Sequence, residues 1–341
     1  MLSIEGLTVE FPSPKGPLRA VDGVTFHVDR GETLGLVGES GSGKSMSALA
    51  VIGLVPPPGR IAGGSIRFDG TELRGMRERD LRRIRGAAVG FVFQEPMTAL
   101  NPVFTIGSQL VETLEAHDVA TGRAARQKAA ELLDAVRLPD PERRLRDYPH
   151  QLSGGQRQRA LIAMALACNP ALLIADEPTT ALDVTVQAEI LDLLREMKDR
   201  FGLALLLITH DLGVVAETAD RVAVMYAGRI VEQSPVGPLF TDPLHPYTRG
   251  LLGSMPGGAT RAGESEGRSP SVKDARQLRA IPGTVPPLGS LPPGCTFAPR
   301  CPDRFEPCDK ARPGDADMEG GRTVKCYLYP SPALPPEGGN R

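Results

Sequence analysis

Eight residues near the N-terminus combine glycines, a lysine and a hydroxyl group at a spacing that suits phosphate binding. Residues 38–45 read G-E-S-G-S-G-K-S and fit the pattern G-x-x-x-x-G-K-S. Glycines let backbone N–H groups surround phosphate oxygens, because no Cβ stands in the way. The lysine can reach the β- and γ-phosphates, and the last serine can hold Mg²⁺. We expect ligand contacts from Gly38, Ser40, Gly41, Ser42, Gly43, Lys44 and Ser45.

The segments on either side of this loop support that interpretation. Residues 33–37 (T-L-G-L-V) form a short apolar run that predicts a buried strand, and residues 45–54 predict a helix. The N-terminus of such a helix would direct its dipole at the phosphates. The alternative is a chance glycine-rich turn, but the strand-loop-helix order favours a phosphate site.

A second apolar run ends in two carboxylates. Residues 171–177 read A-L-L-I-A-D-E, which predicts a buried strand that delivers Asp176 to the phosphate site. Asp176 could bind Mg²⁺ directly or through water. Glu177 could accept a proton from an attacking water. The pattern is only moderately specific alone, and it gains weight because it lies downstream of the phosphate loop.

Two further predicted strands end in polar side chains. Gln94 follows the apolar run 89–93, and His210 follows the run 203–209. Gln94 could contact a metal or water, or it could be an ordinary strand end. A lone histidine after a strand is more often structural than catalytic, so His210 gains a role only from its neighbours.

The N-terminal residues alternate apolar and polar side chains. This period predicts strands over residues 2–11 and 20–28 in a small antiparallel sheet, with a further strand over residues 63–70. Phe11 ends the first strand and could stack on a nucleobase or be an ordinary edge residue. Residues 222–226 and 228–232 predict a hairpin.

The middle of the chain is helical in character. Residues 106–116 and 123–136 carry apolar residues at helical spacing. The run L-S-G-G-Q at 152–156 then opens a long helix that we expect to reach Cys168. Its serine suits an N-cap, and its two glycines let the backbone approach a ligand. A plain capped helix start is the alternative for Ser153, Gly154, Gly155 and Gln156.

Composition bounds the class of protein. The chain has 341 residues, 41% hydrophobic content and a net charge of -2, so it can bury a core and gives no sign of a nucleic-acid partner. Aromatic content is 4% with no Trp, which also disfavours base-stacking surfaces. The sequence has no apolar run long enough to span a bilayer and no signal peptide at its start. We therefore expect a cytosolic protein.

Four of the 5 cysteines lie near the C-terminus. Their spacing is C-x5-C-x6-C-x17-C, at Cys295, Cys301, Cys308 and Cys326. A cytosolic setting argues against disulfides, and four thiolates suit a soft metal. The spacing matches neither zinc ribbons nor bacterial ferredoxins. Four unligated thiols are the alternative.

Together these motifs resemble the ATP-binding cassette (ABC) ATPases, over about residues 1–252. The resemblance implies an α/β fold with a RecA-like P-loop core, an antiparallel β subdomain and an inserted helical subdomain at about 97–165. It implies an ATP hydrolase that uses Mg²⁺ bound by Ser45, Gln94 and Asp176. It also implies roles for Phe11 (base stacking), Gln94 (Q-loop), 153–156 (signature), Glu177 (water activation), 181–183 (D-loop) and His210 (γ-phosphate contact).

Other segments are similar to the ATPase subunits of peptide and nickel importers. These segments are residues 94–102, 245–248, 281–286 and 294–302. The resemblance implies a small Cys-rich C-terminal domain at 253–330 and a tail at 331–341. Some similar subunits hold a [4Fe-4S] cluster on the four cysteines, with structural Zn²⁺ as the alternative. The Gly-rich residues 257–271 predict a flexible loop.

The resemblance also implies partners and a location. In the family two cassettes dimerise head to tail, so that the signature of one faces the γ-phosphate held by the other. We expect a second ATPase subunit, in a heterodimer rather than a homodimer, two integral membrane permease subunits and an extracytoplasmic solute-binding protein. The chain would lie peripherally on the cytoplasmic side of the membrane. Peptide cargo is favoured; nickel or another solute, a soluble non-transport ATPase and an inactive partner are alternatives.

Overall fold

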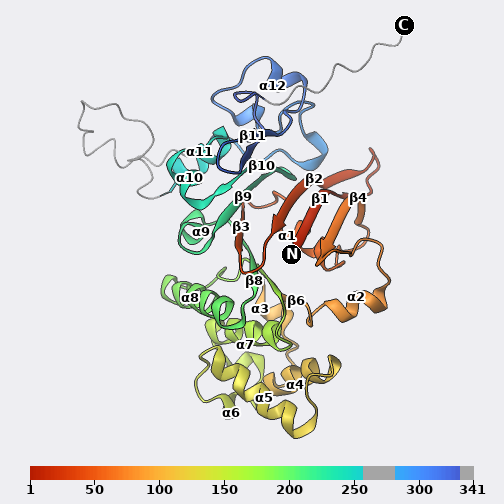
Figure 1. The fold of residues 1–341 in the computed structure, drawn as a ribbon, viewed down its shortest axis with the longest axis vertical. Coiled ribbons are helices and arrows are strands. Elements are labelled where there is room, and N and C mark those ends of the chain that lie inside the picture. The colour runs from red at the N-terminus through yellow and green to blue at the C-terminus, as the bar shows by residue number, and fades with distance from the viewer. Residues whose placement is uncertain (256–280, 331–341) are drawn as a thin grey trace, which may run out of the picture.

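Two β-sheets carry the elements that surround the phosphate-binding loop (Figure 1). The computed structural model describes residues 1–255 and 281–330. One sheet contains β1 (Leu2–Phe11), β2 (Leu18–Val28), β4 (Arg60–Phe68) and β5 (Thr71–Glu72). The other contains β3 (Thr33–Val37), β6 (Val89–Val92), β7 (Leu172–Asp176), β8 (Ala204–Thr209), β9 (Arg221–Tyr226), β10 (Arg229–Pro235), β11 (Ala316–Met318) and β12 (Arg322–Val324).

The four-stranded sheet has the order β2-β1-β4-β5 and is antiparallel throughout. Its register pairs Leu2 with Val28 at one end and Phe11 with Leu18 at the other. Leu2, Ile4, Leu7 and Val9 are fully buried on β1. The predicted antiparallel sheet is thus confirmed, although β2 and β4 begin earlier than the alternation indicated.

The eight-stranded sheet has the order β11-β12-β10-β9-β3-β8-β7-β6. Strands β6, β7, β8, β3 and β9 are parallel, and every residue of β3, β7 and β8 is buried. Such strands read as continuous apolar runs because both faces are covered. The carboxyl ends of β3, β6, β7 and β8 therefore meet at one edge, where the predicted polar residues lie. The predicted hairpin of β9 and β10 is confirmed.

The C-terminal segment completes this sheet. Strand β12 pairs antiparallel with β10, so that Val324 lies opposite Glu232, and β11 pairs with β12. Neither strand was expected from the sequence, because each has only three residues. The segment 281–330 is thereby joined to the sheet that contains β3.

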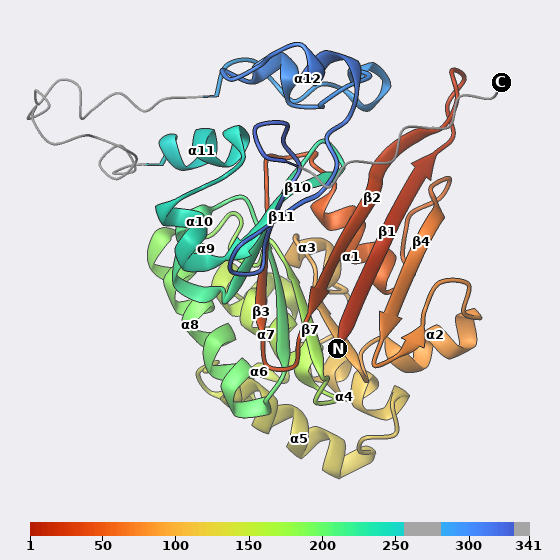
Figure 2. The ribbon, with the colours of Figure 1, turned by 45° about the horizontal axis from the view of Figure 1, so that its top comes forward.

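Helices cover both faces of the large sheet. The α-helices of the described residues are α1 (Lys44–Val51), α2 (Glu78–Ile84), α3 (Pro96–Ala99), α4 (Ile106–Ala116), α5 (Gly122–Ala135), α6 (Pro141–Arg144), α7 (Gly154–Leu166), α8 (Val184–Phe201), α9 (Leu212–Thr218), α10 (Val236–Thr241), α11 (Pro246–Gly253) and α12 (Pro307–Lys310). The 3₁₀ helices in the same ranges are η1 (Pro149–Gln151), η4 (Leu288–Ser290) and η5 (Ala298–Arg300). Figure 2 shows α1 between the two sheets and α8 and α9 on the opposite face.

Alternate residues of the parallel strands supply two different cores. Leu172 and Ile174 of β7 belong to a core that contains α1 and the antiparallel sheet. Leu173 and Ala175 face the other way, into a core shared with α4, α5, α7 and α8. The range 97–165, where a helical subdomain is predicted, contains α4, α5 and α6, which lie at the lower end of the molecule in Figure 1.

Some predicted elements differ from the structure at their ends. The helix expected over 45–54 ends at Val51, because Gly53 adopts a left-handed conformation with φ of 64°. The helix expected over 152–168 is α7, which is shorter at both ends. The predicted loop at 257–271 and the tail at 331–341 lie outside the described residues.

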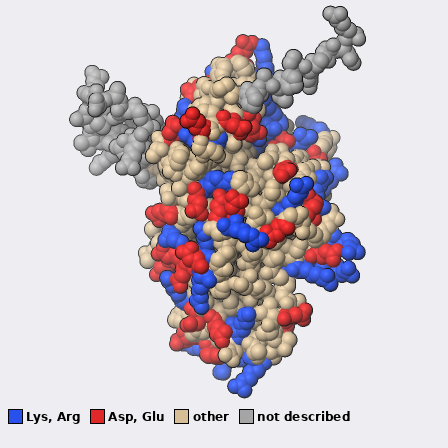
Figure 3. Space-filling model, in the orientation of Figure 1, with Lys and Arg blue, Asp and Glu red and all other residues tan. Residues whose placement is uncertain are grey.

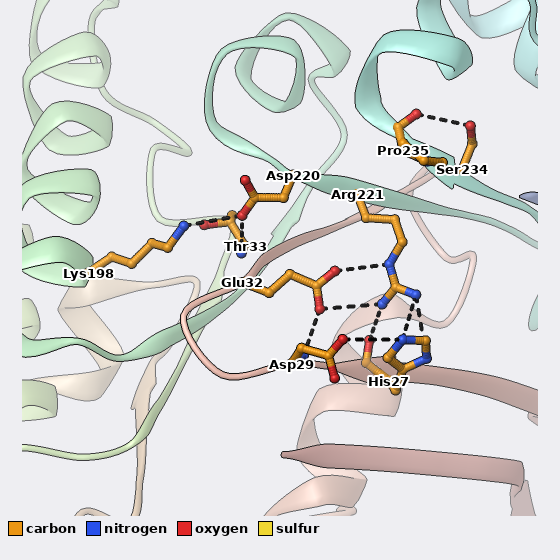
Figure 4. A network of polar contacts seen from close by, with 9 residues as sticks. All are labelled: His27, Asp29, Glu32, Thr33, Lys198, Asp220, Arg221, Ser234 and Pro235. Carbon is orange, nitrogen blue, oxygen red and sulfur yellow. Dashed lines mark hydrogen bonds and ion pairs between the residues drawn. The ribbon is translucent and has the colours of Figure 1, made fainter. Parts of the chain in front are cut away.

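A polar network fixes β2 against the large sheet (Figure 4). Arg221, at the start of β9, donates from Nε to Glu32 at 3.0 Å and from Nη2 to the carbonyl of His27 at 2.6 Å. The neighbouring Asp220 accepts from the backbone N–H of Thr33 at 2.7 Å and from Lys198 at 3.2 Å. These contacts lie at the edge opposite the strand ends that carry the site.

Charges of both signs are interspersed over the face shown in Figure 3. No helix within residues 1–255 and 281–330 is both long and apolar enough to cross a membrane.

Candidate active site

The phosphate-binding loop connects β3 to α1, as predicted. Two positions of the loop require glycine, because other backbone atoms lie too close to leave room for a Cβ. A Cβ on Gly38 would lie 2.1 Å from the carbonyl oxygen of Met225, and one on Gly43 would lie 2.6 Å from that of Ala20. Gly43 also has φ of 101°, which disfavours any other residue. The loop is therefore held against β2 and β9, and its glycines cannot be exchanged without moving the backbone.

Lys44 is enclosed by its own loop. Its Nζ donates to the carbonyl oxygens of Gly38 at 2.8 Å and Glu39 at 3.1 Å, and only 4% of the residue is exposed. Burial lowers the pKa of Lys44, and the carboxylates of Glu177 and Asp176 oppose that shift. The ammonium is thus a positive charge placed inside the loop, where phosphate oxygens would bind.

The Ser45 hydroxyl, in the first turn of α1, meets the Asp176 carboxylate at the end of β7. Ser45 Oγ donates to Asp176 Oδ1 at 2.9 Å. The pKa of Asp176 is raised to about 6, chiefly by burial; the Ser45 hydrogen bond and Lys44 oppose the shift, and the nearby Glu177 adds to it. A hydroxyl and a carboxylate are oxygen ligands that suit Mg²⁺, so this pair fits the predicted magnesium site. Gln94, the predicted third contributor, donates from Nε2 to Glu177, and its place at the magnesium site stays a prediction.

Glu177 is the centre of the strand-end cluster. Its carboxylate accepts from Nε2 of Gln94 at 3.0 Å and lies 3.5 Å from Nδ1 of His210. Its own backbone has φ of 46°, and its N–H donates to the carbonyl of Ile208 on β8 at 2.9 Å. Positive φ in a residue other than glycine is uncommon and directs the side chain away from the line of the strand. The structure thus brings together three residues that the sequence predicted separately.

Thr180 is a fourth member of this cluster that the sequence reasoning missed. Its Oγ1 donates to Oε2 of Glu177 at 2.9 Å. The sequence does place Thr180 only three residues after Glu177, close enough for its hydroxyl to donate to the Glu177 carboxylate. Thr180 therefore helps to hold the orientation of Glu177.

Phe11 lies at the end of β1, beside the loop that precedes β4. The ring is partly exposed, and a Cβ on Gly59 would lie 2.6 Å from it. Gly59 thus leaves room for the aromatic ring at this position. The position agrees with a residue available for base stacking.

The signature residues 153–156 lie at the N-terminus of α7, away from the phosphate loop of the same chain. Ser153 caps the helix: its Oγ accepts from the N–H of Gln156 at 3.3 Å, and its N–H donates to Oε1 of Gln156 at 3.0 Å. A Cβ on Gly155 would lie 2.6 Å from Val186 of α8, and one on Gly154 would lie 3.3 Å from Leu182. Within the described part of the chain, no hydrogen bond or ion pair joins 153–156 to 38–45.

The four C-terminal cysteines line one small cavity. Cys295, Cys301, Cys308 and Cys326 surround it together with apolar side chains and His245. All four are free thiols. Burial raises the pKa of Cys301 to about 11 and also raises the pKa values of Cys295 and Cys326. The fold thus gathers the four residues that the spacing singled out.

This cavity differs from a site for a single ion. In the ranges 1–255 and 281–330, no group of three or more His, Cys, Asp or Glu side chains is arranged to hold a metal ion. Zinc would require the sulfurs to converge at about 2.3 Å from one point. In an iron-sulfur cluster each thiolate binds a different iron, so the sulfurs stay apart.

Family models match two parts of the chain. A model described as ABC transporter matches residues 21–180, and one described as Oligopeptide/dipeptide transporter, C-terminal region matches residues 231–308.

Curated relatives match almost the full length. The chain is 50% identical to the oligopeptide transport ATP-binding protein AppD of Bacillus subtilis, over 96% of this chain and 97% of the relative. It is 47% identical to the dipeptide transport ATP-binding protein DppD of Haemophilus influenzae, over 96% of this chain and 95% of the relative.

A solved structure supports the same assignment. The ATP-binding cassette MJ0796, determined as a dimer in a post-hydrolysis state with ADP and Pi, is 29% identical with a TM-score of 0.62. The match covers 69% of this chain and 99% of that chain. The chain therefore belongs to the ABC transporter ATP-binding proteins, in the group that carries the oligopeptide/dipeptide transporter C-terminal region.

Proposed function

We propose that this protein is the ATP-hydrolysing motor subunit of an ABC importer for di- or oligopeptides. The observation that carries the motor role is the Glu177 carboxylate, which Gln94 and Thr180 hold by hydrogen bonds beside the Ser45–Asp176 pair. Support for the cargo comes from relatives named for oligopeptide and dipeptide transport, which match 96% of the chain.

The phosphate loop would bind the nucleotide through backbone N–H groups, with Lys44 against the β- and γ-phosphates. Phe11 would stack on the base. Ser45 and Asp176 would hold Mg²⁺, which supplies positive charge to the phosphate oxygens when bound. The positive end of α1 adds to this charge at the same edge of the sheet.

Glu177 would polarise the attacking water and accept its proton. A general base must be oriented toward the proton that it takes, and Gln94 and Thr180 restrict the carboxylate. His210, whose side chain is 60% exposed, has room to turn toward a γ-phosphate. The water oxygen would bond to the γ-phosphorus as the bond from that phosphorus to the bridging oxygen breaks, and ADP and inorganic phosphate would leave.

The signature would act on a second cassette. Ser153, Gly154 and Gly155 lie at the N-terminus of α7, and Gln156 closes the capping box. A helix N-terminus binds anionic groups, so this end of α7 would complete the γ-phosphate site of a partner subunit. The dimeric cassette MJ0796 gives support by similarity. A heterodimer with a related ATPase is favoured over a homodimer.

The remaining partners follow from the transporter role. Two integral membrane permease subunits would receive the motion of the helical subdomain, and an extracytoplasmic solute-binding protein would select the cargo. The chain would lie peripherally on the cytoplasmic side of the membrane. Nickel or another small solute is the second candidate cargo. A soluble non-transport ATPase is disfavoured by the C-terminal region, whose family model is described for oligopeptide/dipeptide transporters.

The four cysteines of the C-terminal domain (253–330) would hold a [4Fe-4S] cluster, with Zn²⁺ as the weaker candidate. Their arrangement around one cavity supports this proposal. When bound, the cluster would fix the loops that carry the thiolates. Its role would be structural or redox-regulatory, because the ATP site does not use it.

Uptake of a labelled dipeptide and of a longer labelled peptide tests the cargo. Cells that carry the wild-type chain are compared with cells that carry Glu177→Gln. We expect the variant to lose uptake of one peptide and keep the other, which also assigns the cargo length. Unchanged uptake of both peptides would move the cargo toward nickel or another solute.

A further inference from the structure

Arg300 of the C-terminal segment reaches the phosphate-binding loop. Its guanidinium donates two hydrogen bonds to the carboxylate of Glu39, at 2.7 Å from Nη1 to Oε2 and 3.0 Å from Nη2 to Oε1. Glu39 directly follows Gly38, and 261 residues separate it from Arg300. A pair joined by two parallel bonds fixes the orientation as well as the separation of its partners. This contact joins the loop to a segment that lies outside the nucleotide-binding elements.

Further contacts hold both partners in place. Arg300 is only 8% exposed, and its Nε donates to the carbonyl oxygen of Pro282 at 2.8 Å. The backbone N–H of Glu39 donates to the hydroxyl of Tyr247 on α11 at 2.9 Å. Exposed ion pairs contribute little, because solvent screens them and the side chains remain mobile. A nearly buried arginine with a fixed guanidinium constrains its partner more strongly.

An aromatic cluster lies beside this contact. The ring centroid of Phe297 is 5.2 Å from that of Tyr226 and 5.3 Å from that of Tyr247. The hydroxyl of Tyr226 lies 3.4 Å from Nη1 of Arg300. Phe297 and Arg300 belong to the loop 295–301, which begins and ends with a cysteine of the cavity. Loop 295–301 therefore packs on α11 and β9 and holds Glu39 at the same time.

The backbone at Glu39 in turn determines where Lys44 lies. The carbonyl oxygens of Gly38 and Glu39 both accept from Nζ of Lys44, at 2.8 Å and 3.1 Å. A change in the backbone at these two residues would move the acceptors that place the ammonium. A displacement of about 1 Å at a binding group is enough to weaken its interaction with a ligand.

We propose that Arg300 is a positioning residue for the phosphate-binding loop. By holding Glu39, it keeps the loop in the conformation that binds nucleotide, and it makes nucleotide affinity depend on loop 295–301. The inference goes beyond the proposed transport function, since Arg300 acts through Glu39 and takes no part in bond breaking.

The full-length chain tests this with the variants Arg300→Gln, Glu39→Gln and the double variant. Isothermal titration gives Kd for MgADP, and steady-state assays give KM and kcat for ATP. We expect each single variant to raise Kd and KM by about 2- to 30-fold, the range for residues that couple two sites. We expect kcat to stay within about twofold, because the groups around Glu177 are unchanged. The double variant should bind no more weakly than the weaker single variant, since both remove the same contact.

Arg304→Gln is the matched control. Arg304 lies in the same segment and is paired with Asp309, so its substitution removes an exposed Arg–Asp ion pair that does not reach the loop. We expect its Kd for MgADP to equal that of the wild type. Arg300→Lys keeps the charge without the two-pronged geometry and should give an intermediate Kd.

Three results would overturn the proposal: Kd values of both single variants equal to wild type, additive losses in the double variant, or an equal loss in Arg304→Gln. If Arg300→Gln fails to fold, Glu39→Gln alone tests the proposal. This variant changes only the loop and leaves every contact of the C-terminal segment except the ion pair with Arg300. Wild-type chain that binds MgADP without hydrolysing ATP would count against the motor role and leave the affinity comparison intact.

Discussion

The side-chain amide of Gln94 donates a hydrogen bond of 3.0 Å to the carboxylate of Glu177, 83 residues away in the chain. Gln94 follows β6, Glu177 follows β7, and these strands are parallel neighbours. Since His210 follows β8, which pairs with the other side of β7, Glu177 lies between the two. The parallel order of the strands therefore assembles the cluster.

Replacing Glu177 by Gln should abolish ATP turnover and leave nucleotide binding intact. The amide keeps the size of the side chain but cannot accept the proton of the attacking water, so kcat should fall at least about 100-fold. Phosphate release and Kd for ATP measure the two effects. The exposed Glu112 on α4 provides a control, because Glu112→Gln should leave both unchanged. Retained turnover in Glu177→Gln would refute the assigned role.

Thr180→Val should lower kcat by about 3- to 30-fold, because one hydrogen bond that orients the Glu177 carboxylate is lost. The substitution conserves shape, so KM for ATP should change little. Thr180→Ser keeps the hydroxyl and should restore most of the wild-type kcat. Equal rates in the valine and wild-type enzymes would show that Gln94 alone is enough to orient the carboxylate.

Ser45→Ala should raise the Mg²⁺ concentration needed for half-maximal ATPase activity by at least about tenfold, because it removes an oxygen ligand beside Asp176. The comparison is a magnesium titration at saturating ATP. Ser47→Ala on the same helix is the control, since its hydroxyl donates only to the carbonyl of Gly43. If both variants respond alike to magnesium, Ser45 is not a ligand.

Chain purified without oxygen should contain about four iron and four sulfide per molecule if the cavity holds a [4Fe-4S] cluster. Cys301→Ser should lose most of that iron, whereas Cys168→Ser, outside the cavity, should keep it. Metal analysis and the visible absorption spectrum provide the readout. Zinc alone in the purified protein would rule out the cluster.

Glu232 should give stability a measurable pH dependence. Burial raises its pKa above the ordinary value of 4.5, although backbone N–H groups of Leu244 and His245 donate to its carboxylate. The folded state therefore holds this proton more tightly than the unfolded state, so its contribution is present below pH 4.5 and is lost as pH rises. As pH rises from 4.5 to 7, the unfolding free energy of the wild type should fall relative to that of Glu232→Gln. Urea titrations of both proteins at each pH measure this difference. A constant difference would contradict the shift.

Individual helices and strands were predictable because their apolar periodicity can be read within a few consecutive residues. The strands 2–11 and 33–37 and the helix 106–116 agree with β1, β3 and α4 residue by residue. The phosphate loop was predictable for a related reason: its glycines and lysine act within eight residues. Helix α8 was not predicted, although it has 18 residues and an amphipathic pattern.

Contacts between distant segments could not be read from the sequence. Glu39 is an unspecified position of the loop pattern, and Arg300 lies between two cysteines in a segment whose spacing gives no sign of the loop. Only the packing of loop 295–301 on β9 and α11 brings them together. In the same way β12 has three residues and little pattern of its own, and it becomes a strand because β10 offers an open edge.

The pairing of β12 with β10 has a consequence for how the chain can be shortened. A fragment that stops near residue 252 would leave Glu232 and Gln233 of β10 without the partners Val324 and Thr323. Unpaired strand edges invite pairing with other molecules, so the fragment should self-associate. The C-terminal segment therefore covers an edge of β10 that would otherwise be open to another chain.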